Sequence, residues 1–103
     1  MARQVHLPDM SDVHVNETSL ALLRYIEGRS GTPGRPVFIP LRAMAEALDA
    51  HLATARRSRD ALLENGLIEK RPHYLSNGGQ TEDEIQVTDR GHLALYFALK
   101  AGY

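Results

Sequence analysis

The chain has 103 residues and no cysteine; 43% of its residues are hydrophobic and 24% are charged. These values are typical of one soluble globular domain, and they exclude a disulfide scaffold. No apolar run approaches the roughly 20 residues of a membrane-spanning helix, and residues 1–10 lack the apolar core of a signal peptide. We therefore expect a cytoplasmic protein with no membrane partner. The net charge of −1 disfavours a protein that coats nucleic acid regardless of sequence, because such proteins are strongly basic.

Residues 1–15 show no sustained hydrophobic period and contain Pro8, so we expect an extended arm there. Either the arm is a loosely held terminus, or it crosses to a second subunit. Residues 16–103 are predicted to form the folded domain. Its first helix is expected to begin at Asn16, a good N-cap, and to end at Gly28. Its buried stripe is expected to contain Leu20, Leu22, Leu23 and Ile26.

A short strand fits between Pro36 and Pro40, and two helical patterns follow at residues 41–48 and 52–65. The break between them contains Asp49, which tolerates the left-handed backbone region better than most residues. Gly66 is expected to end the second helix, so that Leu67 folds back onto Leu62. In this second helix, Ala55, Ser58 and Leu62 share one side. Two helices joined by such a turn are typical of a helix-turn-helix.

A β-hairpin is predicted over residues 68–88, because a turn signal at residues 76–79 precedes the alternating run at 84–88. The last helix is expected to begin with Thr88 as its N-cap. Leu93, Tyr96 and Phe97 are predicted to cover the core. Leu95 and Leu99 would then face another side, which predicts a homodimer through these two leucines, with the N-terminal arm as a further candidate contact.

Residues 44–70, with Gly66-Leu67-Ile68 at the helix exit, and Val87-Thr88-Asp89-Arg90-Gly91 resemble winged helix-turn-helix transcriptional regulators. This broad group includes the MarR-like and PadR-like repressors. The resemblance implies an α+β, mainly α fold with a three-helix core, a β-hairpin wing and a C-terminal helix. It also implies that the strand at 37–39 pairs with the hairpin, and that the wing touches phosphate or the minor groove.

The helix at 52–65 is then the candidate reader of double-stranded DNA, because the major groove admits one α-helix and arginine binds guanine with two hydrogen bonds. Arg56 and Arg57 have an alternative interpretation as surface ion pairs with Asp60, since they lie four and three residues from it. The candidate DNA-binding residues on this helix, at the start of the preceding helix and on the wing are Arg42, His51, Ala53, Thr54, Arg56, Arg57, Arg71, His73, Asn77 and Gly78.

Together these features predict a dimeric repressor that recognises a specific DNA sequence and blocks polymerase by occupying a two-fold operator. The competing hypothesis is a winged-helix protein–protein module in a replication, conjugation or antirestriction assembly, because residues 82–84 form an acidic patch. No phosphate-binding loop, nucleophile elbow or zinc-protease motif is present, so we expect neither catalysis nor a cofactor. Asp89 and His92 have helical ligand spacing, but without a third matching ligand we expect no metal site.

Overall fold

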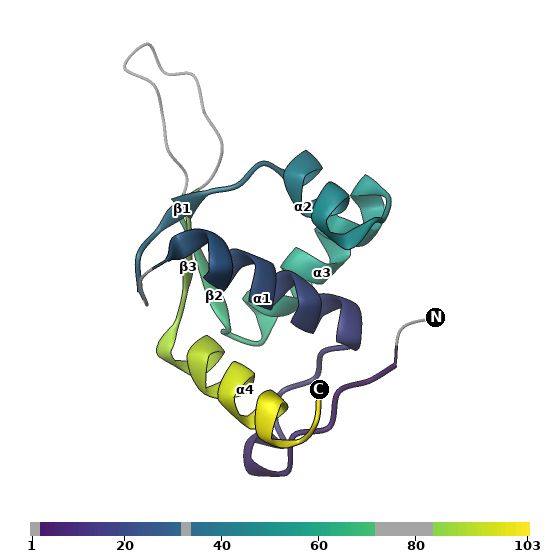
Figure 1. Ribbon diagram of the computed structural model, residues 1–103, viewed down its shortest axis with the longest axis vertical. Helices are drawn as coiled ribbons and strands as arrows, with labels where there is room; N and C mark the ends of the chain where they lie inside the picture. The colour runs from purple at the N-terminus through teal and green to yellow at the C-terminus, as the bar shows by residue number, and fades with distance from the viewer. Residues whose placement is uncertain (1–2, 32–33, 72–83) are drawn as a thin grey trace.

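The computed structural model describes residues 3–31, 34–71 and 84–103 (Figure 1). In these ranges the fold is mainly helical, with a three-stranded antiparallel sheet, which confirms the predicted α+β class. No helix in the described part has the length and apolar character needed to cross a membrane. The elements are η1 (Pro8–Met10), α1 (Glu17–Ser30), β1 (Val37–Phe38), α2 (Leu41–Leu48), α3 (Leu52–Glu64), β2 (Ile68–Arg71), β3 (Glu84–Val87) and α4 (Asp89–Lys100).

The sheet has the order β1-β3-β2, so the short strand between the prolines pairs with the return strand of the hairpin. Its register sets Val37 opposite Ile85 and Ile68 opposite Val87. Ile68, Ile85 and Val87 are buried, because alternate residues of a strand face the same side. One face of the sheet thus contributes to the core against which α1 packs (Figure 1).

Helix α1 begins as predicted, since Asn16 Oδ1 accepts a hydrogen bond from the Ser19 N–H at 2.8 Å. Leu22, Leu23 and Ile26 on its buried side are fully inaccessible to solvent. The expected end at Gly28 is wrong: the helix continues to Ser30, and Gly31 has a φ of 69°. A glycine inside an exposed helical turn weakens the helix without ending it, whereas the left-handed residue after the last turn terminates it.

The α2–turn–α3 unit agrees with the prediction. Helix α2 has the expected bounds, and Asp49 after it is left-handed with a φ of 50°. Helix α3 ends at Glu64, one residue earlier than expected, and Gly66 has a φ of 71°. The Leu67 N–H donates to Leu62 O at 3.0 Å, and both leucine side chains are fully buried. This is the hydrogen bond and the apolar contact of a glycine-terminated helix end.

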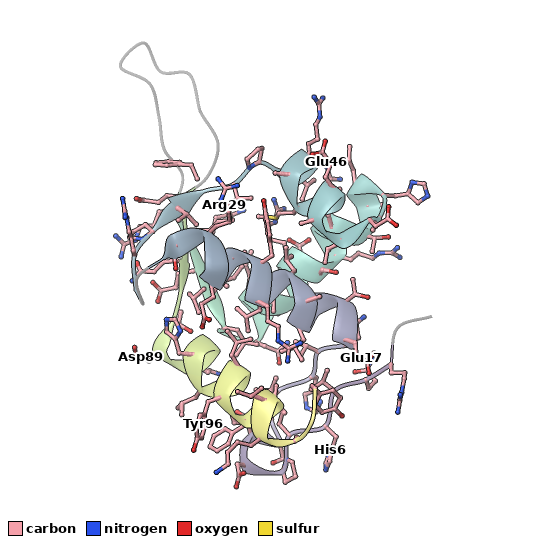
Figure 2. All side chains as sticks on the ribbon, in the orientation of Figure 1. His6, Glu17, Arg29, Glu46, Asp89 and Tyr96 are labelled. Atoms are coloured by element: carbon pink, nitrogen blue, oxygen red, sulfur yellow. The ribbon has the colours of Figure 1, made fainter. Side chains whose placement is uncertain are left out.

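Helix α4 begins with the predicted cap, because the Gly91 N–H donates to Thr88 Oγ1 at 3.0 Å. The face predicted to cover the core is correct for Phe97, which packs against the core, and wrong for Leu93 and Tyr96. Leu93 and Tyr96 are 50% and 53% exposed, and Tyr96 projects outward from the helix (Figure 2). The buried residues of α4 are Gly91, Ala94 and Ala98. These small residues let α4 lie close to α1 and β3. The larger side chains of the helix lie on either side of this buried stripe.

The two leucines predicted for a homodimer contact have different surroundings. Leu99 is 73% exposed. Leu95 is only partly exposed and packs against the core, so the structure does not place it on an open face. The exposed apolar side chains of α4 are Leu93, Tyr96 and Leu99. We refer to these three residues as the α4 face.

The segment before α1 folds back onto the domain. The Val5 N–H donates to Val15 O at 2.9 Å, and the His6 N–H donates to the Tyr103 hydroxyl at 2.9 Å. The Asn65 side chain at the end of α3 accepts from the His14 N–H at 2.8 Å and donates to His14 O at 3.2 Å. The apolar side chains that this segment buries in the core are Val5, Leu7, Met10, Val13 and Val15.

Candidate nucleic-acid interface

Helix α3 has one buried and one exposed side. Ala55, Ser58 and Leu62 are buried, as the sequence predicts, and the helix packs against α1 and α2. The residues predicted to be outward lie together along the other side of its N-terminal half. His51, Ala53, Arg56 and Arg57 are exposed, whereas Thr54 is half-buried.

The ion pairs proposed as an alternative for the arginines do not form. In the described part of the chain Asp60 contacts Arg59 instead, with Arg59 Nη2 3.4 Å from Asp60 Oδ1. Neither Arg56 nor Arg57 forms an ion pair or a hydrogen bond within residues 3–31, 34–71 and 84–103. Their guanidinium donors therefore remain available to an external acceptor, and each has the planar geometry that suits guanine or phosphate.

The beginning of α3 also offers backbone donors. His51 is its N-cap in extended conformation, and the His51 side chain makes no capping hydrogen bond. The first N–H groups of an uncapped helix have no acceptor within the helix, and the helix dipole favours negative charge there. Leu52, the first residue of α3, is 51% exposed. The sequence analysis missed Leu52, although it lies outside the buried period of the helix; an aliphatic side chain there suits a thymine methyl group.

The remaining candidates lie on other elements. Arg42 is exposed on the first turn of α2, whose N-cap Pro40 makes no side-chain capping bond. Arg71 is exposed at the end of β2, where the register sets it opposite Glu84 of β3. The negative charge of Glu84 partly offsets the positive electrostatic potential around Arg71. His73, Asn77 and Gly78 lie outside the described residues, as do Glu82 and Asp83.

The histidine considered for a metal site has a different partner. His92 Nδ1 lies 3.1 Å from Glu27 Oε2, so the contact joins α4 to α1 instead of pairing His92 with Asp89. Within the described ranges no group of three or more metal-ligating side chains is present.

The sequence matches no protein-family model, and no curated protein is similar to it. Three solved structures are similar in fold. The transcriptional regulator MosR of M. tuberculosis has a TM-score of 0.64 at 17% identity, with 84% of this chain and 54% of that chain covered. A mutant MepR of S. aureus bound to an oligodeoxyribonucleotide has a TM-score of 0.64 at 14% identity, with 82% and 56% covered. MarR of Staphylococcus aureus in complex with salicylate and kanamycin has a TM-score of 0.57 at 20% identity, with 81% and 49% covered.

The chain spans about half the length of these structures. The similarity extends over the helical core and the sheet together, since more than four-fifths of this chain is covered in each case. The chain has the winged helix-turn-helix fold of the MarR-type structures.

Proposed function

We propose that this protein is a transcriptional regulator that binds specific double-stranded DNA sequences, and that it acts as a dimeric repressor. The observation that supports this function most strongly is the exposed N-terminal half of α3, where Arg56 and Arg57 have no partner in the described residues. The similarity of the fold to MepR, which was solved with an oligodeoxyribonucleotide, gives further support.

In the proposed complex α3 enters the major groove with its N-terminal half against the base edges. Arg57 and Arg56 donate paired hydrogen bonds to guanine O6 and N7, each worth about 1–3 kcal/mol of discrimination. Thr54 and His51 contribute polar contacts beside them. Arg42 and the free N–H groups of α3 hold the phosphate backbone, which fixes the register of the helix without reading sequence. Arg71 at the base of the hairpin is proposed to contact phosphate.

Dimer formation is proposed through the α4 face. Leu93, Tyr96 and Leu99 are each at least half exposed, and association of two such faces removes their apolar area from water. Two copies related by a two-fold axis present two α3 helices to DNA, so the operator is expected to contain half-sites about one helical turn apart. A dimer bound there represses transcription by occupying the DNA that polymerase needs.

The decisive experiment begins with selection of bound sequences from a random DNA pool, followed by gel-shift titration on the selected site. Arg57→Ala is expected to weaken specific binding by about 5- to 150-fold, which corresponds to the loss of one bidentate base contact. Arg57→Lys keeps the charge but loses the planar fork, so it is expected to lose discrimination while retaining non-specific affinity. Arg29→Ala removes an equal charge near the end of α1, where Arg29 contacts only the Tyr25 hydroxyl among the described residues, and serves as the matched control. Unchanged affinity of Arg57→Ala for the selected site contradicts the proposed role of Arg57.

A salt titration separates this function from the protein–protein hypothesis. Binding through phosphate contacts releases counterions, so affinity is expected to fall steeply as salt increases. A chain that retards no DNA at low salt contradicts the proposed function and favours a protein partner.

A further inference from the structure

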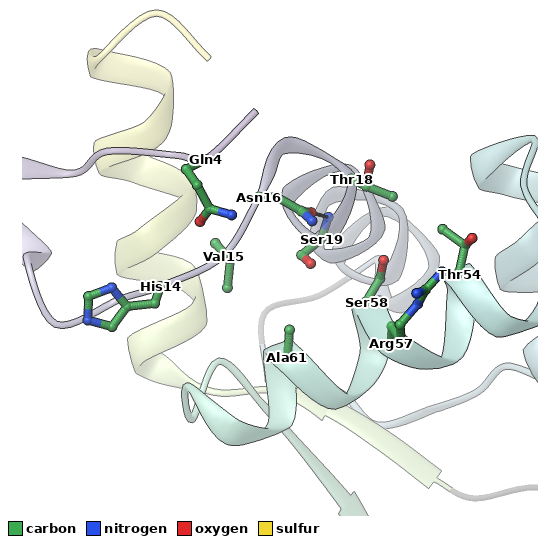
Figure 3. A pocket seen from close by; sticks show the side chains of 10 residues that line it. All are labelled: Gln4, His14, Val15, Asn16, Thr18, Ser19, Thr54, Arg57, Ser58 and Ala61. Atoms are coloured by element: carbon green, nitrogen blue, oxygen red, sulfur yellow. Dashed lines mark hydrogen bonds between the residues drawn. The ribbon is translucent and has the colours of Figure 1, made fainter. Parts of the chain in front are cut away.

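The exposed side of α3 has two borders. On the border toward α1, a pocket of about 460 Å³ lies between the segment before α1, the first turn of α1 and α3 (Figure 3). Its lining residues on α3 are Thr54, Arg57, Ser58 and Ala61. The other border is marked by Arg59, which lies about 160° round the helix from Arg57. The Arg59 side chain is only 20% exposed, and its Nε is buried without a hydrogen-bond partner in the described residues. The strip of α3 that faces away from the domain therefore lies between Arg57 and Arg59.

Asp60 lies in the middle of this outward strip. At about 100° per residue, it is about 140–160° round the helix from each of the three buried residues of α3. Its side chain is 50% exposed. Counted from Ala53, the residues Arg56, Arg57 and Asp60 follow at i+3, i+4 and i+7, which is a spacing at which a helix in the major groove presents the residues that contact bases. A groove that receives Arg56 and Arg57 therefore also receives Asp60.

The carboxylate of Asp60 retains acceptor capacity. Its Oδ1 accepts one long hydrogen bond from Arg59 Nη2 at 3.4 Å, and its Oδ2 forms no hydrogen bond or ion pair within residues 3–31, 34–71 and 84–103. A carboxylate has about four lone-pair sites, so most of those of Asp60 are unoccupied. Beside DNA the phosphates repel this negative charge, which lowers the affinity for every sequence. A donor on a base edge offsets that repulsion only where the base carries one.

The chemistry of the major groove selects the base. Only the amino groups of cytosine and adenine donate hydrogen bonds there, and in adenine the N7 acceptor beside the amino group repels a second carboxylate oxygen. We propose that Asp60 is a specificity-determining residue that accepts a hydrogen bond from N4 of a cytosine, close to the guanine proposed for Arg57; this inference rests on the proposed function. Asp60 lowers the affinity for DNA in general and raises the selectivity of α3. The half-site then contains a guanine that an arginine contacts and a cytosine that Asp60 contacts.

The test combines variants of Asp60 with variants of the DNA site that the wild-type protein selects from a random pool. Each cytosine of the half-site is replaced in turn by thymine, which presents an acceptor in place of the N4 donor. At one of these positions the replacement is expected to weaken wild-type binding by about tenfold. Asp60→Ala is expected to lose this discrimination and to bind unrelated DNA about two- to threefold more tightly, which corresponds to the repulsion between unit charges about 8 Å apart in water. Asp60→Asn gains a donor, so its own selected site is expected to show adenine at that position.

Asp9→Asn is the matched control, because it removes an equal charge from η1, an exposed position on an element that packs against α4. It is expected to leave both the selected site and the affinity for unrelated DNA unchanged. An equal gain of affinity for unrelated DNA in Asp9→Asn and Asp60→Ala shows an effect of net charge alone and refutes the position of Asp60 in the groove. A cytosine preference that persists in Asp60→Ala refutes the role of Asp60 and leaves the proposed function standing. If the wild-type protein selects no sequence, the proposed function fails and this inference fails with it.

Discussion

At Gly91, helix α4 lies in close contact with the residues that follow α3 and precede α4. A Cβ atom placed there would lie 2.1 Å from Leu67 O and 2.8 Å from Val87 Cγ1. Leu67 O also accepts a hydrogen bond from the Thr88 N–H at 3.1 Å. This hydrogen bond opposes any movement of the carbonyl oxygen away from a new Cβ atom. Gly91→Ala is therefore expected to move the first turn of α4 away from the end of α3 and to destabilise the fold.

The size of the effect follows from two opposed terms. Alanine stabilises a helix interior by about 1 kcal/mol relative to glycine. Overpacking a filled site costs about 1–3 kcal/mol, and stretching the hydrogen bond to Leu67 O costs about 1 kcal/mol more. The contact with a backbone oxygen cannot be relieved by a side-chain rotation, so we expect net destabilisation of about 1–3 kcal/mol. For a domain of this size, that lowers the melting temperature by roughly 5–20 °C.

Gly28 provides the matched control, because it also lies inside a helix but no neighbouring atom would come within 4 Å of a Cβ at this position. Gly28→Ala is expected to stabilise the protein by about 0.5–1 kcal/mol through the helix term alone. Thermal melts followed by circular dichroism compare the two variants with the wild type. A Gly91→Ala protein that melts at or above the wild-type temperature refutes the close contact between α4 and Leu67.

Three further changes test other parts of the structure. Arg90 donates to Asp12 Oδ2 at 2.8 Å and holds the pKa of the Asp12 carboxyl below its ordinary value of 3.8; the stabilisation is therefore present above that value and is lost as pH falls through the folded-state pKa. The difference in urea midpoint between wild type and Asp12→Asn is expected to shrink below pH 3.8, and a constant difference contradicts the pairing. Asn65→Ala removes both side-chain bonds to His14, so a loss of about 1–3 kcal/mol in urea unfolding and faster exchange of the His14 amide are expected; unchanged exchange contradicts this contact. Leu99→Glu is expected to sediment as a monomer. Its circular dichroism spectrum is expected to match that of the wild type, because Leu99 is 73% exposed and is not needed for the fold of one chain. An unchanged oligomeric state removes Leu99 from the proposed interface.

The α2–turn–α3 unit was predictable because the signals that define it are local. Asp49 and Gly66 supply left-handed backbone at the two helix ends, and residue types that tolerate this region are visible in a sequence. Ala55, Ser58 and Leu62 recur at helical spacing, so the exposed side with Arg56 and Arg57 follows from geometry. The same reasoning did not single out Leu52, since an apolar residue at a helix start gives no local sign of its exposure.

The pocket was not predictable, because its lining comes from segments that the fold alone brings together. Gln4 and His14 precede α1, whereas Thr54 and Ser58 belong to α3. A serine on a helical stripe, as Ser58 is, gives no indication in the sequence of whether its hydroxyl is buried beside a pocket. Only the packing of α1 against α3 brings Ser58 and Ser19 to the same space.

The sequence by itself determined the order and the ends of the helices around the turn, because capping, glycine placement and apolar spacing act over a few residues. The tertiary structure decided which side of α4 faces inward and where residues 3–15 lie. In α4 the large apolar residues suggested the core side, yet the close approach of Leu67 O leaves no room for a side chain at Gly91, and the other fully buried residues of the helix are Ala94 and Ala98. Val5 and Val15 are buried although the apolar residues of their segment have no regular spacing. Removal of apolar surface from water is favourable whatever the local backbone conformation, so only the folded structure shows which of these side chains reach the core.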